Sequence, residues 1–284
     1  ASMLVALDDG IVDTTAIVDT GNGIYKMHGS PMKDHNWYRG GYQKITLQQI
    51  MGYSSNIGVS RIIDENYAKK PTKFVEGLYR VGIGEDLKLD IPGYLPPQIR
   101  YPNKNNWWKT TLPWMSIGYE TQIAPINTLA FYNAIANNGV MVKPRFVKAI
   151  MKEGKIIEEF PVEVLKESIC STNALNQMQN ILEGVVSKGL GKQAGSKQFH
   201  VSGKTGTALV SQGKSGYKGG STQYLVSFCG YFPSENPKYS CIVAIRKPGY
   251  PASGGSMAGP VFSRIAERVM AGSLKRDLNE AIDS

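Results

Sequence analysis

The sequence predicts an α+β fold: a largely antiparallel sheet flanked by helices, an all-helical lobe, and a functional cleft between the two. Segments with the apolar spacing of helices dominate the first half of the chain. β-rich runs joined by turn residues dominate the second half. The 284 residues, with a hydrophobic content of 42%, are sufficient for a substantial core, which argues against disorder.

The first half reads as helices separated by glycine-rich turns. Residues 3–9 are apolar and stop at Gly10, which is typical of a helix end. The glycines spread over residues 11–42 indicate turns, and the stretch 92–114 is rich in Pro, Asn and Trp and is expected to be an irregular loop. The remaining helices of this half are predicted over 47–53 with Thr46 as cap, over 57–67, after Pro71 as far as Gly82, and over 126–138 between Pro125 and Gly139.

The second half combines a sheet with packing helices. Gly154 between short apolar runs indicates a hairpin over 140–157, and apolar spacing predicts a helix over 172–187. The remaining predictions are β-rich runs over 199–210, 224–232 and 239–246, a hairpin connection over 233–237, and a helix over 260–270. We therefore expect a helical lobe over about 10–138, a sheet-containing lobe over about 139–271, and a polar, frayed tail over 272–284.

Composition excludes several classes of protein. The net charge of +9 comes from scattered Lys and Arg residues that do not interleave with aromatics, so nucleic-acid binding is not expected. The same positive charge is better explained as a means of attraction to an anionic polymer or to an anionic membrane face. The three cysteines, Cys170, Cys229 and Cys241, lack the spacing of a zinc site and are expected to be free thiols. No apolar run approaches the roughly 18 residues of a transmembrane helix, and no signal peptide is visible.

Ser54-Ser55-Asn56 lies at the joint between two predicted helices. A Ser-x-Asn pattern has little specificity and occurs twice more. Ser171 is expected to cap a helix, and Ser234 to stabilise a hairpin turn. Ser54 also fits a helix cap. Its position upstream of the sheet, where short polar side chains face the predicted cleft, favours a role in a functional site.

Lys204-Thr205-Gly206 lies within a β-rich run and is followed by Thr207. On an edge strand these residues present a cation, two hydroxyls and a backbone N–H, which suit a substrate carboxylate and a developing oxyanion. An ordinary glycine-containing strand or bulge is the alternative. The similar Lys214-Ser215-Gly216 lies in a polar run and is expected to be a loop.

The two motifs, in this order, look like two of the three corners of an active-site serine enzyme that handles acyl-D-alanyl peptides or β-lactams. The third corner is a Ser-x-x-Lys pair. Ser30-Pro31-Met32-Lys33 matches these letters, but the chemistry requires serine at a helix start, and no helical apolar stripe follows. The histidines form no triad with a G-x-S-x-G serine, which the sequence lacks. They are His28, His35 and His200.

The chain resembles the transpeptidase domain of class B penicillin-binding proteins over about residues 1–271. The resemblance is carried by the stretches ITLQQIMGYSSNIGVSRI, SIGYETQIAPINTLAFYNAIANNG, VSGKTGTA and FCGYFPSENPKYSCIVAI. It implies a penicillin-binding/β-lactamase-like fold and a D,D-transpeptidase that cross-links peptidoglycan stem peptides through a serine acyl-enzyme. It also implies inhibition by β-lactam antibiotics and no metal or organic cofactor.

The resemblance assigns a role to each motif residue. Ser54 would relay a proton to the leaving group, Asn56 would hold the substrate amide, and Lys204 would tune the electrostatics beside Ser54. Thr205 and Thr207 would bind the terminal carboxylate, and the Thr207 N–H would form half of the oxyanion hole. Ser55 and Gly206 are expected to line the substrate site.

The same resemblance places the nucleophile outside this chain. The family's Ser-x-x-Lys pair immediately precedes the helix that residues 1–10 continue, so we expect it, together with the first sheet strands, upstream of Ala1. A membrane anchor that holds the enzyme on the periplasmic side of the inner membrane, and contacts with division or elongation proteins, are likewise expected upstream. Glu120 stands where the family often has glycine, two positions after Gly118.

Two rival functions remain open at this point. A β-lactamase or D,D-carboxypeptidase shares the same corners, although the stretch from Ser116 to Asn138 favours the transpeptidase. A non-catalytic β-lactam sensor or division scaffold is the other alternative. The residues just before Ala1, and the rate at which a penicillin acyl-enzyme is hydrolysed, discriminate among these functions.

Overall fold

The computed structural model describes residues 1–210, 223–246 and 249–282. Its α-helices are α1 (Ser2–Asp8), α2 (Leu47–Gly52), α3 (Asn56–Tyr67), α4 (Pro71–Arg80), α5 (Thr111–Ser116), α6 (Pro125–Ala136), α7 (Thr172–Ser187) and α8 (Gly259–Ile282). Single turns of 3₁₀ helix lie at Trp37–Arg39 and Lys192–Ala194, and a π-helical turn lies at Gly254–Ala258.

The main sheet consists of three antiparallel strands in the order β11-β12-β13. These strands are β11 (Ser202–Val210), β12 (Gln223–Phe232) and β13 (Tyr239–Arg246). The short strands pair as β1 (Ile17–Asp19) with β4 (Lys44–Thr46), β2 (Ile24–Met27) with β3 (Ser30–Lys33), β5 (Gln98–Ile99) with β6 (Thr121–Gln122), β7 (Met141–Val142) with β10 (Val164–Lys166), and β8 (Ala149–Lys152) with β9 (Lys155–Glu159).

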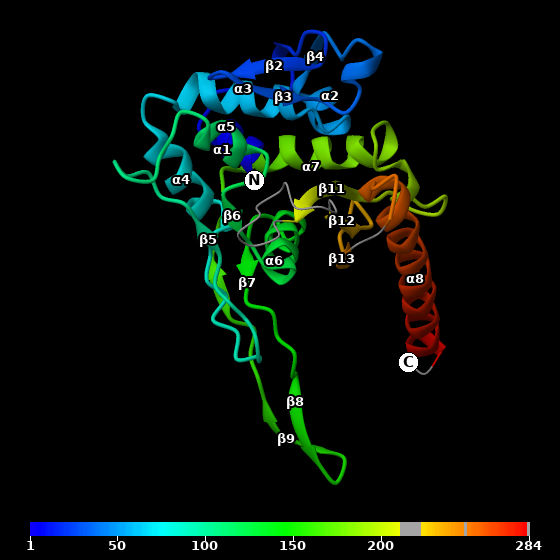
Figure 1. The fold of residues 1–284 in the computed structure, drawn as a ribbon. Coiled ribbons are helices and arrows are strands. Elements are labelled where there is room, and N and C mark those ends of the chain that lie inside the picture. The colour runs from blue at the N-terminus through cyan, green and yellow to red at the C-terminus, as the bar shows by residue number, and fades with distance from the viewer. Residues whose placement is uncertain (211–222, 247–248, 283–284) are drawn as a thin grey trace.

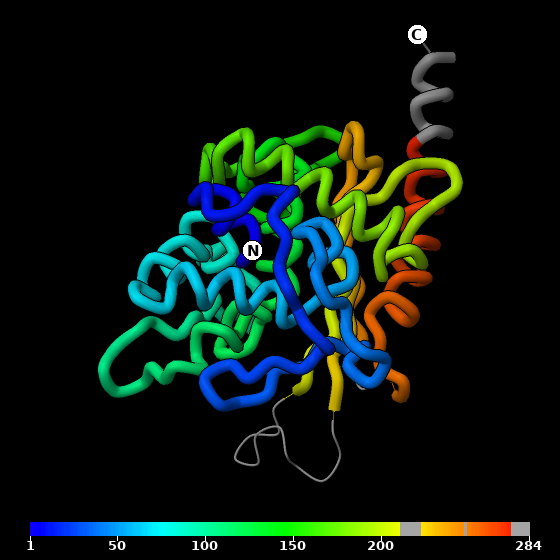
Figure 2. Tube along the Cα trace, turned by 90° about the horizontal axis from the view of Figure 1, so that it is seen from above, coloured from blue at the N-terminus to red at the C-terminus, as the bar shows by residue number. Residues whose placement is uncertain are grey.

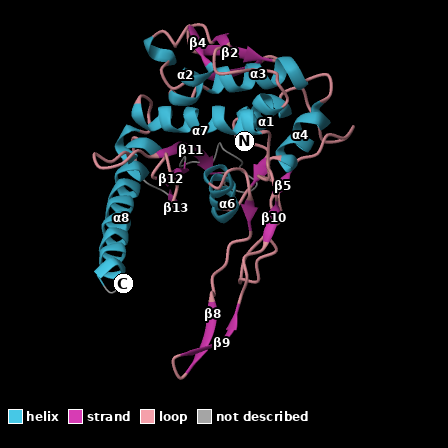
Figure 3. Cartoon of the chain, turned by 180° about the vertical axis from the view of Figure 1, so that it is seen from behind, coloured by secondary structure: helices cyan, strands magenta, loops and turns pink. Residues whose placement is uncertain are grey.

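Helix α7 lies between two layers (Figures 1 and 3). One layer contains α2, α3 and the strands β1–β4, and the other contains the β11–β13 sheet. Strand alternation gives the sheet two different faces. Phe228 and Phe232 point to the face covered by α8, where they contact Phe262, whereas Tyr231 joins the core formed by the helices. Helix α6 packs on this second face, where Asn133 bonds to Ser240 of β13.

The largest hydrophobic core surrounds α1, and residue 1 lies near the middle of the fold (Figure 2). Leu4, Val5 and Ala6 are completely buried because α3, α4 and α7 all pack against this short helix. Its C-terminal end is held by ion pairs from Arg80 to Asp8 and Asp9. The chain from Ala1 therefore runs through the centre of the molecule before it reaches the surface.

The predicted α+β class and most predicted helices are confirmed. Thr46 forms a capping box with Gln49 at the start of α2, and Pro125 occupies the first turn of α6. Gly139, just beyond α6, has a φ of +88°, which glycine adopts without strain. The three β-rich runs of the second half form the main sheet, and residues 232–239 connect β12 to β13.

Some local predictions were wrong. The turn-rich segment 11–42 contains three short strands, whose three or four residues are too few to show an alternating pattern. The segment 92–114 is not wholly irregular, because it contains β5 and the start of α5. The expected frayed tail is largely helical, since α8 continues to Ile282. The division of the chain near residue 138 stays a prediction.

The predicted hairpin over 140–157 is only partly correct. Strand β7 pairs with β10, while β8 and β9 form the hairpin that turns at Gly154 and extends away from the body of the molecule (Figure 1). Among the described residues, no helix has both the length and the apolar character needed to cross a membrane.

Candidate active site

The two sequence motifs meet in the structure. The Lys204 Nζ atom lies 2.8 Å from the Ser54 Oγ atom and donates a hydrogen bond to it, across 150 positions of sequence. Ser54 occupies the joint between α2 and α3, and Lys204 lies near the start of β11. Strand β11 pairs Lys204 with Cys229 and Ser202 with Tyr231. The lysine therefore projects from the same sheet face as Tyr231, the face on which α6 packs and which joins the largest core.

Burial gives the Lys204 amine an unusual acidity. Desolvation lowers its pKa to about 8, from an ordinary value of 10.5. Residue 1 is partly buried against the largest hydrophobic core and lies within electrostatic range of this lysine. An amine with a pKa near neutrality can exchange a proton with a neighbouring hydroxyl more readily than an ordinary lysine can.

The backbone at Ser54 is held in a rare conformation. Its φ is +55°, in the left-handed region that non-glycine residues seldom adopt. The N–H groups of Ser54 and Ser55 bond to the carbonyls of Met51 and Ile50 at the end of α2. This turn directs the Ser54 hydroxyl toward Lys204 and lets Ser55 begin α3. Strained residues of this kind persist only where their surroundings fix them.

A buried carboxylate anchors this turn. The Asp34 Oδ2 atom accepts a 2.7 Å hydrogen bond from the Ser55 hydroxyl, and its Oδ1 atom accepts a 3.1 Å bond from the Ile57 N–H. Asp34 is completely buried, and desolvation raises its pKa despite these bonds. We did not identify Asp34 from the sequence. It lies just after β3 in a segment read only as turns, and no motif marks it.

The structure corrects the expectation for Ser55. Its side chain is only 1% exposed, and its hydroxyl accepts from the Gly58 N–H while it donates to Asp34. Ser55 is therefore the N-cap of α3, with no surface left for substrate. Asn56, the first residue of α3, is half-buried, and its Nδ2 atom donates to the Lys33 carbonyl at 3.1 Å. That bond orients the amide beside Ser54.

The two threonines lie on the other face of β11. Thr205 and Thr207 are two positions apart, so they project on the same side of the strand, opposite to Lys204. The Thr207 Oγ1 atom accepts from the Gly254 N–H at 3.1 Å, and this leaves its own O–H free to donate to an anion. Lys204 reaches the Thr205 Oγ1 atom at 3.4 Å, which links the two faces at this end of the strand.

Glycines allow the close packing around the motif. A Cβ atom on Gly206 would lie 2.5 Å from the Ser227 hydroxyl oxygen on β12. One on Gly254 would lie 2.4 Å from the Gly206 carbonyl oxygen. Gly206 therefore leaves room for the Ser227 side chain on the neighbouring strand, and Gly254 lets the π-helical turn approach the β11 backbone closely enough to reach Thr207. A side chain at Gly254 would push this turn away from the motif.

A second set of contacts supports the joint from the Tyr53 side. The rings of Tyr53 and Tyr42 stack with centroids 4.9 Å apart, and the Tyr42 hydroxyl hydrogen-bonds to His35 at 2.9 Å. Burial lowers the pKa of His35, and the charge of Lys204 lowers it further, against the opposing charge of Asp34. His35, for which no role was predicted, therefore lies within electrostatic reach of the site.

The other candidate residues lie elsewhere. Ser30 and Lys33 lie on β3, an extended strand, so they do not form the helix-start pair that the chemistry requires. Ser171 is the N-cap of α7, and Ser234 bonds to Ser202 beside the hairpin connection. Lys214-Ser215-Gly216 lies outside the described residues. His200 is mostly exposed and pairs with Glu235.

The structure explains the departure at Glu120. Its φ is +61°, a conformation that glycine adopts freely, and its carboxylate pairs with Arg100 at 2.8 Å. Among the described residues, no group of three or more His, Cys, Asp or Glu side chains is placed to hold a metal ion.

Comparisons with known proteins agree with this fold. Residues 1–267 match the model of the penicillin-binding protein transpeptidase domain, so the chain belongs to this family. The chain is 26% identical to penicillin-binding protein PbpB of Mycolicibacterium smegmatis over 92% of its length, and 29% identical to the probable peptidoglycan D,D-transpeptidase PenA of Neisseria meningitidis over 95%. These alignments cover 40% and 42% of the respective relatives, so the chain spans about two fifths of their length.

Solved structures show the same arrangement of elements. The transpeptidase domain of penicillin-binding protein 3 from Burkholderia pseudomallei superimposes with a TM-score of 0.76 at 27% identity. The match covers 95% of this chain and 76% of that one. The predicted resemblance to penicillin-binding transpeptidases is thereby confirmed.

Proposed function

We propose that this chain is the larger part of the transpeptidase domain of a class B penicillin-binding protein, a peptidoglycan D,D-transpeptidase. The single observation that carries the proposal is the 2.8 Å hydrogen bond between Lys204 and Ser54, which joins two motifs of a serine acyl-transfer site. The family match over residues 1–267 and the name of the PenA relative support the same reaction.

Substrate binding uses residues on both motifs. The terminal carboxylate of a D-alanyl-D-alanine stem peptide is held at the edge of β11 by the hydroxyls of Thr205 and Thr207, next to the charge of Lys204. The Asn56 side chain holds the peptide amide. The Thr207 N–H donates to the carbonyl oxygen as that oxygen gains negative charge.

The nucleophile is a serine of a Ser-x-x-Lys pair carried by residues that precede Ala1. Residue 1 is partly buried against the main core and lies within electrostatic range of Lys204, so a residue joined directly to it would lie close to the site. The serine oxygen bonds to the carbonyl carbon of the penultimate D-alanine. The bond from this carbon to the terminal D-alanine nitrogen breaks, and the serine proton passes to that nitrogen through Ser54 and Lys204.

The second half-reaction forms the cross-link. An amine on a neighbouring stem peptide attacks the acyl-enzyme ester, an amide bond forms, and the serine recovers a proton from the attacking amine. A β-lactam imitates the D-alanyl-D-alanine terminus and leaves an ester that hydrolyses slowly. Lys204, with a pKa near 8, supplies a cation at neutral pH that can also pass a proton on.

We place this reaction on the outer side of the plasma membrane, where peptidoglycan is assembled. The E. coli relative FtsI, which is 27% identical over 94% of this chain, supports assignment to the same class of wall enzymes. Attachment to the membrane, and recruitment by division or elongation proteins, are assigned to parts of the protein other than these residues. Stem peptides and β-lactam antibiotics are the ligands of the site described here.

Labelling of the full-length protein with a fluorescent penicillin tests this proposal. Lys204→Ala should slow acylation by about a hundredfold to a thousandfold, since it removes a preorganised charge from the site. The melting temperature of the same variant shows whether the fold is retained. Lys166→Ala is the matched control, because this lysine pairs with Glu85 away from the site and its loss should not alter labelling.

Three results would count against the proposal. Acylation of Lys204→Ala at the wild-type rate would remove the assigned role of the lysine. Absence of any acylation in the wild-type protein would favour a non-catalytic scaffold. Rapid release of the label would instead indicate a β-lactamase, because a transpeptidase keeps the penicilloyl ester for far longer than one catalytic cycle.

A further inference from the structure

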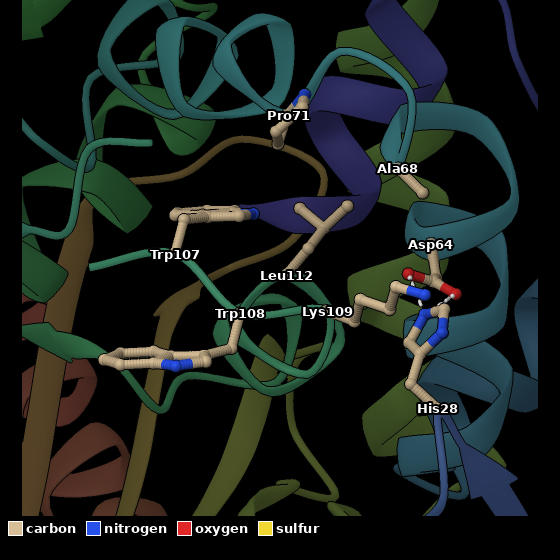
Figure 4. Close-up of a pocket in the computed structure, with 8 residues that line it drawn as sticks. All are labelled: His28, Asp64, Ala68, Pro71, Trp107, Trp108, Lys109 and Leu112. Carbon is tan, nitrogen blue, oxygen red and sulfur yellow. Dashed lines mark hydrogen bonds and ion pairs between the residues drawn. The ribbon is translucent and has the colours of Figure 1, made fainter. Parts of the chain in front are cut away.

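A separate pocket of about 320 Å³ opens beside the C-terminal half of α3 (Figure 4). It is lined by residues from the β2–β3 turn, α3, the start of α4, and the segment that leads into α5. These residues are His28, Asp64, Ala68, Pro71, Trp107, Trp108, Lys109 and Leu112. The proposed transpeptidase reaction uses none of them.

Two tryptophans form the apolar part of the pocket. The indole rings of Trp107 and Trp108 are seen edge-on and roughly parallel in Figure 4, and Leu112 lies beside them. Trp107 is partly buried against the main core, which fixes its position, whereas Trp108 is 59% exposed. Arg100 packs on the Trp108 ring at 5.5 Å from its centroid and supports it. An exposed indole held in this way is a platform for the apolar face of a ligand.

The polar part of the pocket lies opposite the indoles. The His28 Nε2 atom lies 2.8 Å and 3.0 Å from the two carboxylate oxygens of Asp64. The side chain of Lys109 extends toward this pair in Figure 4. The three side chains together offer carboxylate acceptors, a ring nitrogen and an amine donor within one small region.

The charged side chains in and beside the pocket indicate that its ligand is neutral. A cationic ligand would meet Lys109 as well as Arg100 on the Trp108 ring, so the pocket is not a cation cage. An anionic ligand would meet the Asp64 carboxylate, which is 15% exposed and already shared with His28. A neutral ligand with one apolar face and several hydroxyl or amide groups satisfies all of these side chains at once.

We propose that this pocket binds an N-acetylated amino sugar of the peptidoglycan glycan strand. The C–H face of the sugar ring lies on the indoles, and its hydroxyl and acetamido groups bond to Asp64, His28 and Lys109. The volume, at the small end of the range for ligand pockets, suits a single sugar unit. The identity of the sugar rests on the proposed function, because that reaction requires a polymer in which such sugars carry the stem peptides.

The position of the pocket fits this assignment. Asp64 lies eight residues after Asn56 on the same helix, which corresponds to about 12 Å along the helix axis. Met32, Ile57 and Trp114 pack together in a small apolar cluster against α3. A stem peptide in the active site therefore leaves its glycan strand within reach of the tryptophans.

Calorimetric titration of the full-length protein with chitotriose, a neutral trimer of N-acetylglucosamine, tests the inference. Trp108→Ala should weaken chitotriose binding by at least tenfold, and Trp108→Phe should restore part of it because an aromatic platform remains. Trp37→Ala is the matched control, since Trp37 is 43% exposed, packs under Lys33 and lies outside the pocket. The melting temperatures of all three variants should stay close to that of the wild type.

The proposed sugar site can be disproved independently of the proposed transpeptidase function. If the wild type shows no saturable chitotriose binding, or if Trp108→Ala binds as tightly as the wild type, the sugar site is wrong. Equal loss of affinity in Trp37→Ala would likewise overturn it. Penicillin acylation is measured on the same protein, so intact acylation with no sugar binding overturns only the sugar site, and absent acylation overturns the proposed function.

Discussion

The two ends of helix α3 show how one element serves two kinds of site. At its N-terminal end, Ser55 and Asp34 are buried and hydrogen-bonded, and the Ser54 backbone is held in a left-handed turn. At its C-terminal end, the Asp64 carboxylate faces an open pocket together with the exposed Trp108. The same helix therefore has one end fixed by buried hydrogen bonds, which we call the rigid end, and one accessible end.

The difference follows from the chemistry proposed for each end. Proton transfer needs donor and acceptor at fixed separation in a region without bulk water, because electrostatic effects are largest there. A sugar is recognised through area and many weak polar contacts, which surface side chains provide without strain. The completely buried Asp34 and the partly exposed His28–Asp64 pair are thus not equivalent features, although each places an aspartate at one end of α3.

Among the changes that compare the two ends of α3, the largest effect is expected when the rigid end loses its buried anchor, Asp34. Asp34→Ala leaves the Ser55 hydroxyl and the Ile57 N–H without their buried acceptor, at a cost of about 1–3 kcal/mol. If part of that cost appears as misplacement of Ser54, penicillin acylation should slow by about tenfold to a hundredfold. Stopped-flow acylation rates and the melting temperature together measure the two contributions.

The controls separate positioning from general destabilisation. Asp34→Asn keeps the side-chain shape and one acceptor, so it should recover part of the acylation rate. Asp13→Asn changes an exposed aspartate that bonds only within its own turn and should leave the rate unchanged. Wild-type acylation by Asp34→Ala would show that the turn at Ser54 is held without the carboxylate.

A smaller effect is expected in the pH dependence of stability. The pKa of Lys204 is about 8 in the folded protein and near 10.5 in the unfolded chain. Below pH 8 both states are protonated, and the folded state bears the full cost of a buried ammonium. Between about pH 8 and pH 10.5 only the folded lysine has lost its proton, so this cost falls as the pH rises.

Lys204→Met should therefore be more stable than the wild type at pH 7, by an amount that decreases toward pH 10. For a chain of this size, 1 kcal/mol corresponds to about 2–4 °C in melting temperature. We expect the difference in melting temperature between Lys204→Met and the wild type to become smaller by at least about 2 °C from pH 7 to pH 10. Lys155→Met, on the exposed strand β9, should show no such narrowing. A constant difference for Lys204→Met would show that the lysine is not desolvated.

The sequence contained enough to predict the elements that carry the site. Apolar spacing located the joint between α2 and α3, and the β-rich run located Lys204 on a strand, because both signals are local. The proximity of Ser54 and Lys204 is not local: it depends on α7 packing between the two layers. The resemblance of the motifs to a known family supplied that link.

Asp34 and the tryptophan pocket show where sequence reasoning ends. Nothing in the stretch from Met32 to His35 distinguishes a buried carboxylate from an exposed turn residue, because burial there depends on α3 packing over β3. Trp107 and Trp108 were read only as loop residues. Their relation to His28 and Asp64 arises from three segments that are distant in sequence. Such sites depend on tertiary contacts and leave no periodic pattern.

The smallest effect distinguishes two serine helix caps, Ser171 of α7 and Ser55 of α3. Ser171→Ala removes the cap of α7 and should lower the free energy of unfolding by about 1 kcal/mol, without changing penicillin acylation. Ser55→Ala removes the cap of α3 and also a hydrogen bond to Asp34, so it should cost at least as much and slow acylation as well. Urea denaturation measures the first quantity and stopped-flow labelling the second. If the two variants slowed acylation equally, the rigid end of α3 would have no special part in the reaction, and the contrast between its two ends would reduce to burial alone.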